Sequence, residues 1–443
     1  MNAIVCSALL LALVCTTAPS SAQIGLPRLP TPGLPLPPLP TSNLPLPVPV
    51  PRAVGDVLEQ PVLSSVRARA RDLLQRYPRQ VERDPQGAPV VRSVILVLAP
   101  DEQALQQALT RGYLIESDQT LQPLGDRVIT LLVPPGVTTR RALRDLRAAD
   151  PAGSYDFDHL FVSMQAAPPR DAGVAPTPDA LPEAVDVRVG LIDGGVDTEH
   201  LAFATRRPEV SGCDGGPMPS EHGTAVASLF VGRAPEFRGA APGAQLVAVD
   251  VYCEAAAPGG RVRDIVVALA SLMSANVRVI NMSVVGPDNA VLAAVVRKVI
   301  AQSIVIVAAS GNDGPNAAPL YPAAYPGVVA VTAVDAHAKL LLEASGGEHV
   351  RFAAPGADML AASLGGKYAA VRGTSYASPL VAGLIARLLA REDSVGVEQV
   401  MQQLAASAAR PDNGRRNPRN SYGLVGMELR TDPAQFAGRV APR

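Results

Sequence analysis

The chain has 443 residues, with 39 Lys or Arg against 40 Asp or Glu, so its formal net charge is −1. This length is sufficient for one large core or for two to three domains. The basic residues are not gathered into a stripe, which argues against nucleic acid as a partner. The five histidines are scattered and no Cys-x-x-Cys or His-Glu-x-x-His pattern occurs, so the sequence gives no support to a zinc site.

The N-terminus is typical of a secretory signal peptide, which we place at residues 1–22. An apolar run covers residues 3–14, and the segment ends in Ser20-Ser21-Ala22, which fits the small-x-small rule of signal cleavage. The apolar run is too short for a comfortable transmembrane helix. We therefore expect a secreted or periplasmic protein with no membrane contact beyond the signal peptide.

Two cysteines, Cys213 and Cys253, lie beyond the signal peptide. An even pair in an oxidising compartment favours a disulfide over metal ligation. We therefore expect these two residues to be bonded to each other.

Composition divides the region before the main domain into four parts. Residues 23–54 form a Pro-rich linker in extended polyproline II, and residues 55–89 form a charged, weakly helical segment. At 90–165 the pattern predicts a small α+β domain of order βαββαβ. Its elements are expected at 93–98, 101–112, 113–117, 127–133, 138–150 and 154–162. A linker rich in Ala, Pro and Asp follows at 166–182.

A larger domain is predicted at 183–435, followed by a tail at 436–443. Apolar strands are expected at 187–192, 245–251, 278–282, 304–309 and 328–332, and helices at 222–231, 262–276, 289–302 and 375–391. Continuous apolar strands that alternate with helices indicate an α/β fold with a mostly parallel, doubly wound sheet and helices on both faces. In such sheets the chemistry lies beyond the carboxyl ends of the strands.

Four residues near those strand ends form a candidate catalytic set. Asp193 directly follows the first strand of this domain, and His222 begins a helix. Asn312 lies in a glycine-flanked turn, while Ser375 begins the last helix, where unpaired amides favour a developing oxyanion. Each residue alone has an ordinary alternative as a turn or capping residue. Together they supply the carboxylate, imidazole, nucleophile and oxyanion donor that acyl transfer needs.

The segments around these residues resemble the motifs of the subtilisin-like serine peptidases. GLIDGGVD, EHGTAVAS, AASGNDG and GTSYASPLVAG are similar to the family's aspartate, histidine, asparagine and serine motifs, and they follow the family's order. The resemblance covers about residues 185–430. The domain at 90–165 resembles the family's propeptide, which assists folding and inhibits the enzyme.

The resemblance implies a serine endopeptidase that hydrolyses peptide bonds in proteins and is made as an inhibited, self-processed precursor. Asp193, His222 and Ser375 would form the triad, and Asn312 would donate to the oxyanion. The expected substrate-binding residues are Ser283, Val284, Val285, Ala309, Ser310 and Gly311. The implied partners are protein or peptide substrates and the propeptide-like domain as an intramolecular inhibitor.

Two departures from the family pattern carry further expectations. Many relatives have an Asn-rich calcium loop at the position of residues 232–238, but this stretch is short of oxygen ligands, so we expect no recognisable calcium site and no cofactor. The resemblance also implies that Val285 replaces a common glycine on the wall of the substrate cleft and that Leu320 fills the floor of the P1 pocket. These side chains imply a preference for small or medium apolar P1 residues.

Two other functions stay open. The chain could be a catalytically silent binding module, although binding alone has no physical need for all four candidate residues. The acyl-enzyme could also pass to an amine, which would make the protein a transpeptidase. Sequence does not separate hydrolysis from aminolysis.

Overall fold

The computed structural model describes residues 66–163, 170–171, 183–213, 216–235, 237–253, 259–391, 396–410 and 423–435. The expected signal peptide, the Pro-rich linker, the C-terminal tail and most of the linker at 166–182 lie outside these ranges. The described residues all belong to one compact unit, Glu59–Arg443. Within the described ranges, every helix is too short or too polar to cross a membrane.

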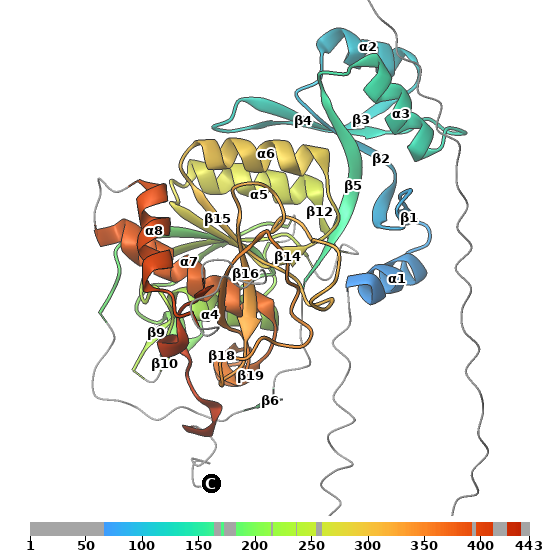
Figure 1. Cartoon of the computed structure of the whole chain (residues 1–443). Helices are drawn as coiled ribbons and strands as arrows, with labels where there is room; N and C mark the ends of the chain where they lie inside the picture. The colour runs from blue at the N-terminus through green and yellow to red at the C-terminus, as the bar shows by residue number, and fades with distance from the viewer. Residues whose placement is uncertain are drawn as a thin grey trace, which may run out of the picture. The chain divides into compact units, whose positions relative to one another are not determined.

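An eight-stranded parallel sheet forms the centre of the larger domain (Figure 1), with the strand order β20-β17-β16-β15-β13-β7-β11-β8. Its strands are β7 (Arg188–Asp193), β8 (Glu209–Ser211), β11 (Gln245–Asp250), β13 (Val279–Met282), β15 (Val305–Ala309), β16 (Val329–Val334), β17 (Val350–Pro355) and β20 (Gly423–Leu424). The expected parallel sheet is confirmed. It is wider than the sequence predicted, because β8 and β20 are short and β17 contains a charged residue and a proline.

Helices cover both faces of this sheet (Figure 1). One face packs against α4 (Glu221–Val231), α7 (Thr374–Arg391) and α8 (Val397–Ser407), and the other against α5 (Val262–Ser274) and α6 (Ala290–Ala301). Side chains alternate between the two cores along each strand, as in β7, where Leu191 enters the first core and Ile192 the second. Burial on both faces explains why these strands read as continuous apolar runs.

The larger domain also contains several short elements. They are β6 (Arg170–Asp171), β9 (Arg233–Ala234), β10 (Phe237–Arg238), β12 (Gly260–Arg261), β14 (Val284–Val285), β18 (Met359–Ser363), β19 (Lys367–Val371) and the 3-10 turns at Leu201–Phe203, Met427–Leu429 and Pro433–Gln435. Of these, β12 and β14 matter for the site, because both pair with a strand of the N-terminal domain.

The N-terminal domain has the expected βαββαβ order. It consists of β2 (Pro89–Leu98), α2 (Glu102–Thr110), β3 (Leu114–Leu121), β4 (Asp126–Leu132), α3 (Thr139–Ala149) and β5 (Ser154–Ser163), preceded by α1 (Val66–Arg76) and β1 (Val81–Arg83). The antiparallel order is β5-β2-β4-β3, with β1 added beside β2. Asp101 and Thr138 cap α2 and α3 by accepting hydrogen bonds from first-turn amides.

The two domains share a buried interface. Leu96 and Leu98 of β2 lie in the same apolar cluster as the residues of α5 and α6. The last strand of the small domain, β5, extends past its own sheet and pairs antiparallel with both β12 and β14. The Asp158 carboxylate accepts a 2.6 Å hydrogen bond from Arg261 at this interface. The end of the small domain is therefore anchored in the larger one.

Candidate active site

Asp193 and His222 form a buried hydrogen-bonded pair at the carboxyl end of β7. One carboxylate oxygen of Asp193, Oδ1, accepts from the amide of Gly194 at 2.7 Å and lies 2.7 Å from His222 Nδ1. A carboxylate can only accept, so the ring proton sits on Nδ1 and the lone pair on Nε2. Both side chains are almost fully buried. The pair thus fixes the tautomer that a general base requires.

A close approach of α4 to the turn after β7 places the imidazole. Ser220 caps α4 by accepting from the amide of Gly223 at 3.0 Å, and its hydroxyl donates to the Gly195 carbonyl at 3.1 Å. A Cβ at Gly223 would lie 2.3 Å from the carbonyl oxygen of Gly194. Glycine is therefore required next to His222, because any side chain there would push α4 away from Asp193.

Ser375 is the second residue of α7 and directly precedes a tyrosine that packs against the imidazole. The ring of the following residue, Tyr376, has its centroid 5.5 Å from that of His222. Ser283 supports the helix start, because its hydroxyl donates to the Ser375 carbonyl at 3.2 Å. Within the described residues, neither Ser375 Oγ nor His222 Nε2 has a hydrogen-bond partner. A hydroxyl and a ring nitrogen of the kind that acyl transfer uses are thus both buried and free of other hydrogen bonds within the described residues.

Asn312 lies in the turn after β15 and contacts the start of α7. Its carboxamide oxygen accepts from the amide and the hydroxyl of Thr374, each at 3.1 Å. The same hydroxyl accepts from the amide of Gly311 at 3.2 Å. These bonds fix the carboxamide plane, and its Nδ2 group lies on the side opposite to the Thr374 bonds. The first-turn amides of α7, which the helix ladder does not use, lie in the same region.

Of the six expected substrate-binding residues, two pair with β5, and the other four form contacts within the larger domain. Val284 and Val285 form β14 and pair with β5, so their backbone binds an extended segment of this chain. The hydroxyl of Ser310 instead donates to the Ser345 carbonyl at 2.8 Å. The other members are engaged or buried inside the domain, namely Ser283 at α7, Gly311 at Thr374 and Ala309 within β15.

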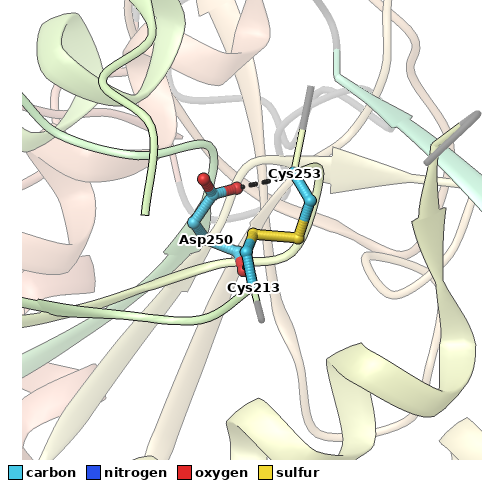
Figure 2. A group of neighbouring side chains, drawn as sticks. All are labelled: Cys213, Asp250 and Cys253. Atoms are coloured by element: carbon cyan, nitrogen blue, oxygen red, sulfur yellow. Dashed lines mark hydrogen bonds between the residues drawn. A yellow bond between two sulfur atoms is a disulfide. The ribbon is translucent and has the colours of Figure 1, made fainter. Parts of the chain in front are cut away.

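Cys213 and Cys253 form a disulfide with a Cα–Cα distance of 5.5 Å. Asp250 lies beside it, and its Oδ1 accepts from the Cys253 amide at 3.2 Å (Figure 2). Its Oδ2 accepts from the amide of Met218 at 3.2 Å. Since each sulfur is bonded to the other, this cluster is a covalent link and not a metal-binding group. It ties the segment that leads to His222 to the end of β11, next to Asp193.

Within the stretch 232–238, where the resemblance places the calcium loop of many relatives, β9 and β10 pair antiparallel. The described side chains of this hairpin, from Gly232 to Pro235 and then Phe237 and Arg238, offer no oxygen atom. The expectation about calcium stays a prediction.

Comparison with known proteins decides the family. A model of the subtilase family matches residues 185–425, which is more than half of the chain. The chain belongs to the subtilase family. Subtilisin E from Bacillus subtilis (strain 168) is 33% identical over 240 residues, which cover 50% of this chain and 60% of subtilisin E. The minor extracellular protease Epr from the same organism is 29% identical over 261 residues, covering 58% of this chain and 40% of Epr.

Among solved structures, this subtilase is similar to fervidolysin from Fervidobacterium pennivorans, a keratinolytic enzyme related to subtilisin. The TM-score is 0.63 with 17% identity, over 80% of this chain and 62% of fervidolysin. At this identity the similarity shows the fold alone. This subtilase spans about three fifths of the length of subtilisin E, the first curated relative above.

Sequence reasoning missed two residues of this subtilase's site. Thr374 orients Asn312, and the signal for it was its place inside the Gly-Thr-Ser motif. Tyr376 is buried beside His222, and burial, together with the nearby Asp193, raises the pKa of its phenol. The phenol therefore stays neutral and adds no charge to the catalytic centre.

Proposed function

We propose that this subtilase is a secreted serine endopeptidase, made as a precursor that its own N-terminal domain inhibits and that it cleaves itself. The observation that carries the proposal is the pairing of Val162 and Ser163 at the end of β5 with Val285 and Val284 of β14. An extended backbone that pairs with a cleft strand is the way in which a peptide substrate binds by β-augmentation. Here that backbone belongs to the same chain.

The proton path follows from the Asp193–His222 bond. His222 Nε2 takes the proton of the Ser375 hydroxyl while Oγ attacks the scissile carbonyl carbon. The imidazolium that forms is stabilised by the buried Asp193 carboxylate, and Nε2–H then gives its proton to the leaving amine. A water molecule, activated by the same nitrogen, hydrolyses the acyl-enzyme and restores Ser375.

The tetrahedral oxyanion receives donors from two elements. Asn312 Nδ2–H and the Ser375 amide both lie where the start of α7 meets the turn after β15. The positive end of the α7 dipole adds to this stabilisation. Thr374 acts on the oxyanion through Asn312, as a positioning residue.

The register of β5 suggests the first cut. The pairs Val162–Val285 and Ser163–Val284 run antiparallel. Ser283, which directly precedes β14, donates its hydroxyl to the Ser375 carbonyl, and the residue that follows Ser163 in the chain is Met164. We therefore assign the first cleavage to the Met164–Gln165 bond. Methionine at P1 agrees with a preference for medium apolar residues.

Phe161, an aromatic residue three positions before Met164, supports the same assignment. A Cβ at Gly286 would lie 2.6 Å from the ring of Phe161, so glycine opens the space in which that ring sits. Phe161 is fully buried and belongs to the cluster with Val284 and Val291. A substrate with an aromatic side chain at this position would bury the same surface, which contributes about 2 kcal/mol or more of transfer free energy.

Secretion is supported by the N-terminal apolar segment and by the disulfide, which persists in oxidising compartments. N-terminal sequencing of the protein recovered from the medium or the periplasm tests this part. A chain that still begins at Met1 and stays in the cytoplasm would refute it.

Fluorophosphonate labelling of the full chain tests the activity, alongside Ser375→Ala. We expect labelling and a new N-terminus at Gln165 in the wild type, and neither in the variant. A wild type that folds, releases its N-terminal domain under mild acid and still takes no label would instead be a silent binding module. Addition of an amine nucleophile distinguishes the transpeptidase, which would convert most acyl-enzyme to amide instead of acid.

A further inference from the structure

The helix α1, which precedes the βαββαβ domain, contacts the catalytic cleft directly. The amide of Val66 donates to Asp313 Oδ1 at 2.7 Å, across 247 residues of sequence. Asp313 follows the oxyanion asparagine, Asn312. The start of α1 therefore lies beside the turn that carries Asn312.

One face of α1 packs into the cleft. Val66 and Leu73, seven residues apart and so on the same side of the helix, join a cluster with Val162, Val285 and Leu320. Val162 belongs to the inserted strand β5, and Leu320 to the expected floor of the P1 pocket. The helix thus covers β5 and the pocket wall at the same time.

Arg69 lies on this face, between Val66 and Leu73. Its guanidinium donates to the carbonyl of Ser163, the last described residue of β5. Burial lowers the pKa of Arg69, and the phenol oxygens of Tyr252 and Tyr376 oppose that shift. Tyr376 is the ring beside His222. The cation is therefore held at the edge of the catalytic centre.

The cap that Asp313 provides links the formation of α1 to docking. An isolated helix of 11 residues is marginal in water, because its nucleation cost is not recovered over so few bonds. A carboxylate from the peptidase domain satisfies an amide at its start and interacts favourably with the helix dipole. None of the side chains of α1 is fully buried, so burial alone gives the helix little stability.

From these contacts we propose that α1 is a second closure of the active site, in which Arg69 clamps the end of β5 in the cleft and the helix covers it. The inference rests on the proposed peptidase function and extends it to regulation. The first closure is β5 in the cleft and the second is α1 over it. Both belong to the fragment that ends at Met164, so they leave together after the first cut. Without α1, the end of β5 would lose the Arg69 bond and the cover of the helix, and it would leave faster.

Release kinetics of the self-cleaved full chain test this closure. Activity on a short chromogenic peptide is followed after dilution, for wild type, Arg69→Ala, Arg69→Lys and Arg71→Ala. Arg71 is the matched control, because it lies on the exposed side of the same helix. We expect activity to emerge at least about tenfold faster in Arg69→Ala, with Arg71→Ala like wild type and Arg69→Lys in between. Equal rates for Arg69→Ala and Arg71→Ala overturn the closure.

Two internal controls separate this inference from the proposed function. After complete release, kcat/KM must be identical in all four proteins, because residue 69 has left. If no protein shows activity, hydrogen exchange of the α1 amides in the Ser375→Ala chain still tests whether α1 closes the site. We expect protection there and at least about tenfold faster exchange when Arg69→Ala is added, because opening α1 exposes its amides. Unchanged exchange in that double variant contradicts the clamp.

Discussion

The carboxamide oxygen of Asn312 is held by two groups of one residue, the amide and the hydroxyl of Thr374, both at 3.1 Å. The residue before Ser375 therefore determines the direction in which the Asn312 carboxamide points. Its side chain is fully buried, so no water can replace the hydroxyl.

Thr374→Val should impair turnover through Asn312. The substitution keeps the shape of the side chain but removes one bond to Asn312 and one to Gly311. We expect kcat to fall by about 10- to 100-fold with little change in KM. This is less than the roughly 10²- to 10³-fold that loss of the oxyanion asparagine costs in subtilisin. Thr374→Ser should recover most of the activity. A larger change in KM than in kcat would contradict a role in the transition state.

Leu320→Ala should widen P1 selectivity. A Cβ at Gly311 would lie 2.6 Å from Leu320 Cδ1, so this side chain fills the space beside the oxyanion turn. Shortening it makes room for large side chains, and we expect aromatic P1 residues to gain about tenfold in relative kcat/KM in a peptide library. Leu342→Ala is the control, because Leu342 is 88% exposed. A wild type that already prefers aromatic P1 residues would refute the underlying preference.

Loss of the disulfide should lower the free energy of unfolding. Cys213 and Cys253 are 40 residues apart, and closing such a loop reduces the entropy of the unfolded chain, with an upper value of about 4 kcal/mol. Urea unfolding of Cys213→Ser, Cys253→Ser and the double variant, each with Ser375→Ala to prevent self-digestion, measures the loss. All three variants should lose the same free energy of unfolding relative to the chain that keeps both cysteines. Two free thiols in the denatured, unreduced wild type would show that the bond is absent in solution.

Acid should destabilise the N-terminal domain through Asp84. Burial raises the pKa of this carboxyl, but hydrogen bonds from His159 and the amides of Ala88 and Gln86 outweigh it and hold the pKa below its usual value. Because the pKa of Asp84 is lower in the folded than in the unfolded chain, its ionised carboxylate stabilises the fold at a pH above the unfolded pKa of about 4. This contribution is lost as the pH falls through the folded pKa. Urea unfolding of the Ser375→Ala chain, measured from about pH 6 to about pH 3, should show that the free energy of unfolding falls around the unfolded pKa of about 4.

Asp84→Asn should flatten that profile below about pH 4. Asp186→Asn is the control, since its carboxylate is 97% exposed. Equal pH profiles for Asp84→Asn and the wild type would mean that other carboxyl groups cause the acid sensitivity.

Calcium removal should leave the enzyme unchanged. The described residues of the β9–β10 hairpin supply no side-chain oxygen, whereas calcium takes six to eight oxygen ligands. We expect the same thermal midpoint and the same activity in excess chelator as in millimolar calcium. A midpoint that rises by several degrees with calcium would reveal a site that the sequence does not indicate.

The central sheet could be predicted because each of its long strands, such as β7 and β15, is buried on both faces and so reads as an apolar run. Asp193 and Asn312 were found at the ends of those two strands. The docking of α1 could not be predicted, because Val66 meets Asp313 across 247 positions and no local pattern encodes that contact. The pairing of β5 with β14 depends in the same way on the tertiary arrangement of two domains.

The strand β5 belongs to two structures at once, because it pairs with β2 inside the small domain and with β14 beside Ser375. Folding of the small domain holds the strand extended and so prepares its last residues for the cleft. Folding of this domain and occupation of the cleft therefore stabilise each other. If the chain is the inhibited precursor proposed above, its inhibition lasts only as long as the N-terminal domain stays folded, and heat, acid or a protease that unfolds this domain would act as an activator.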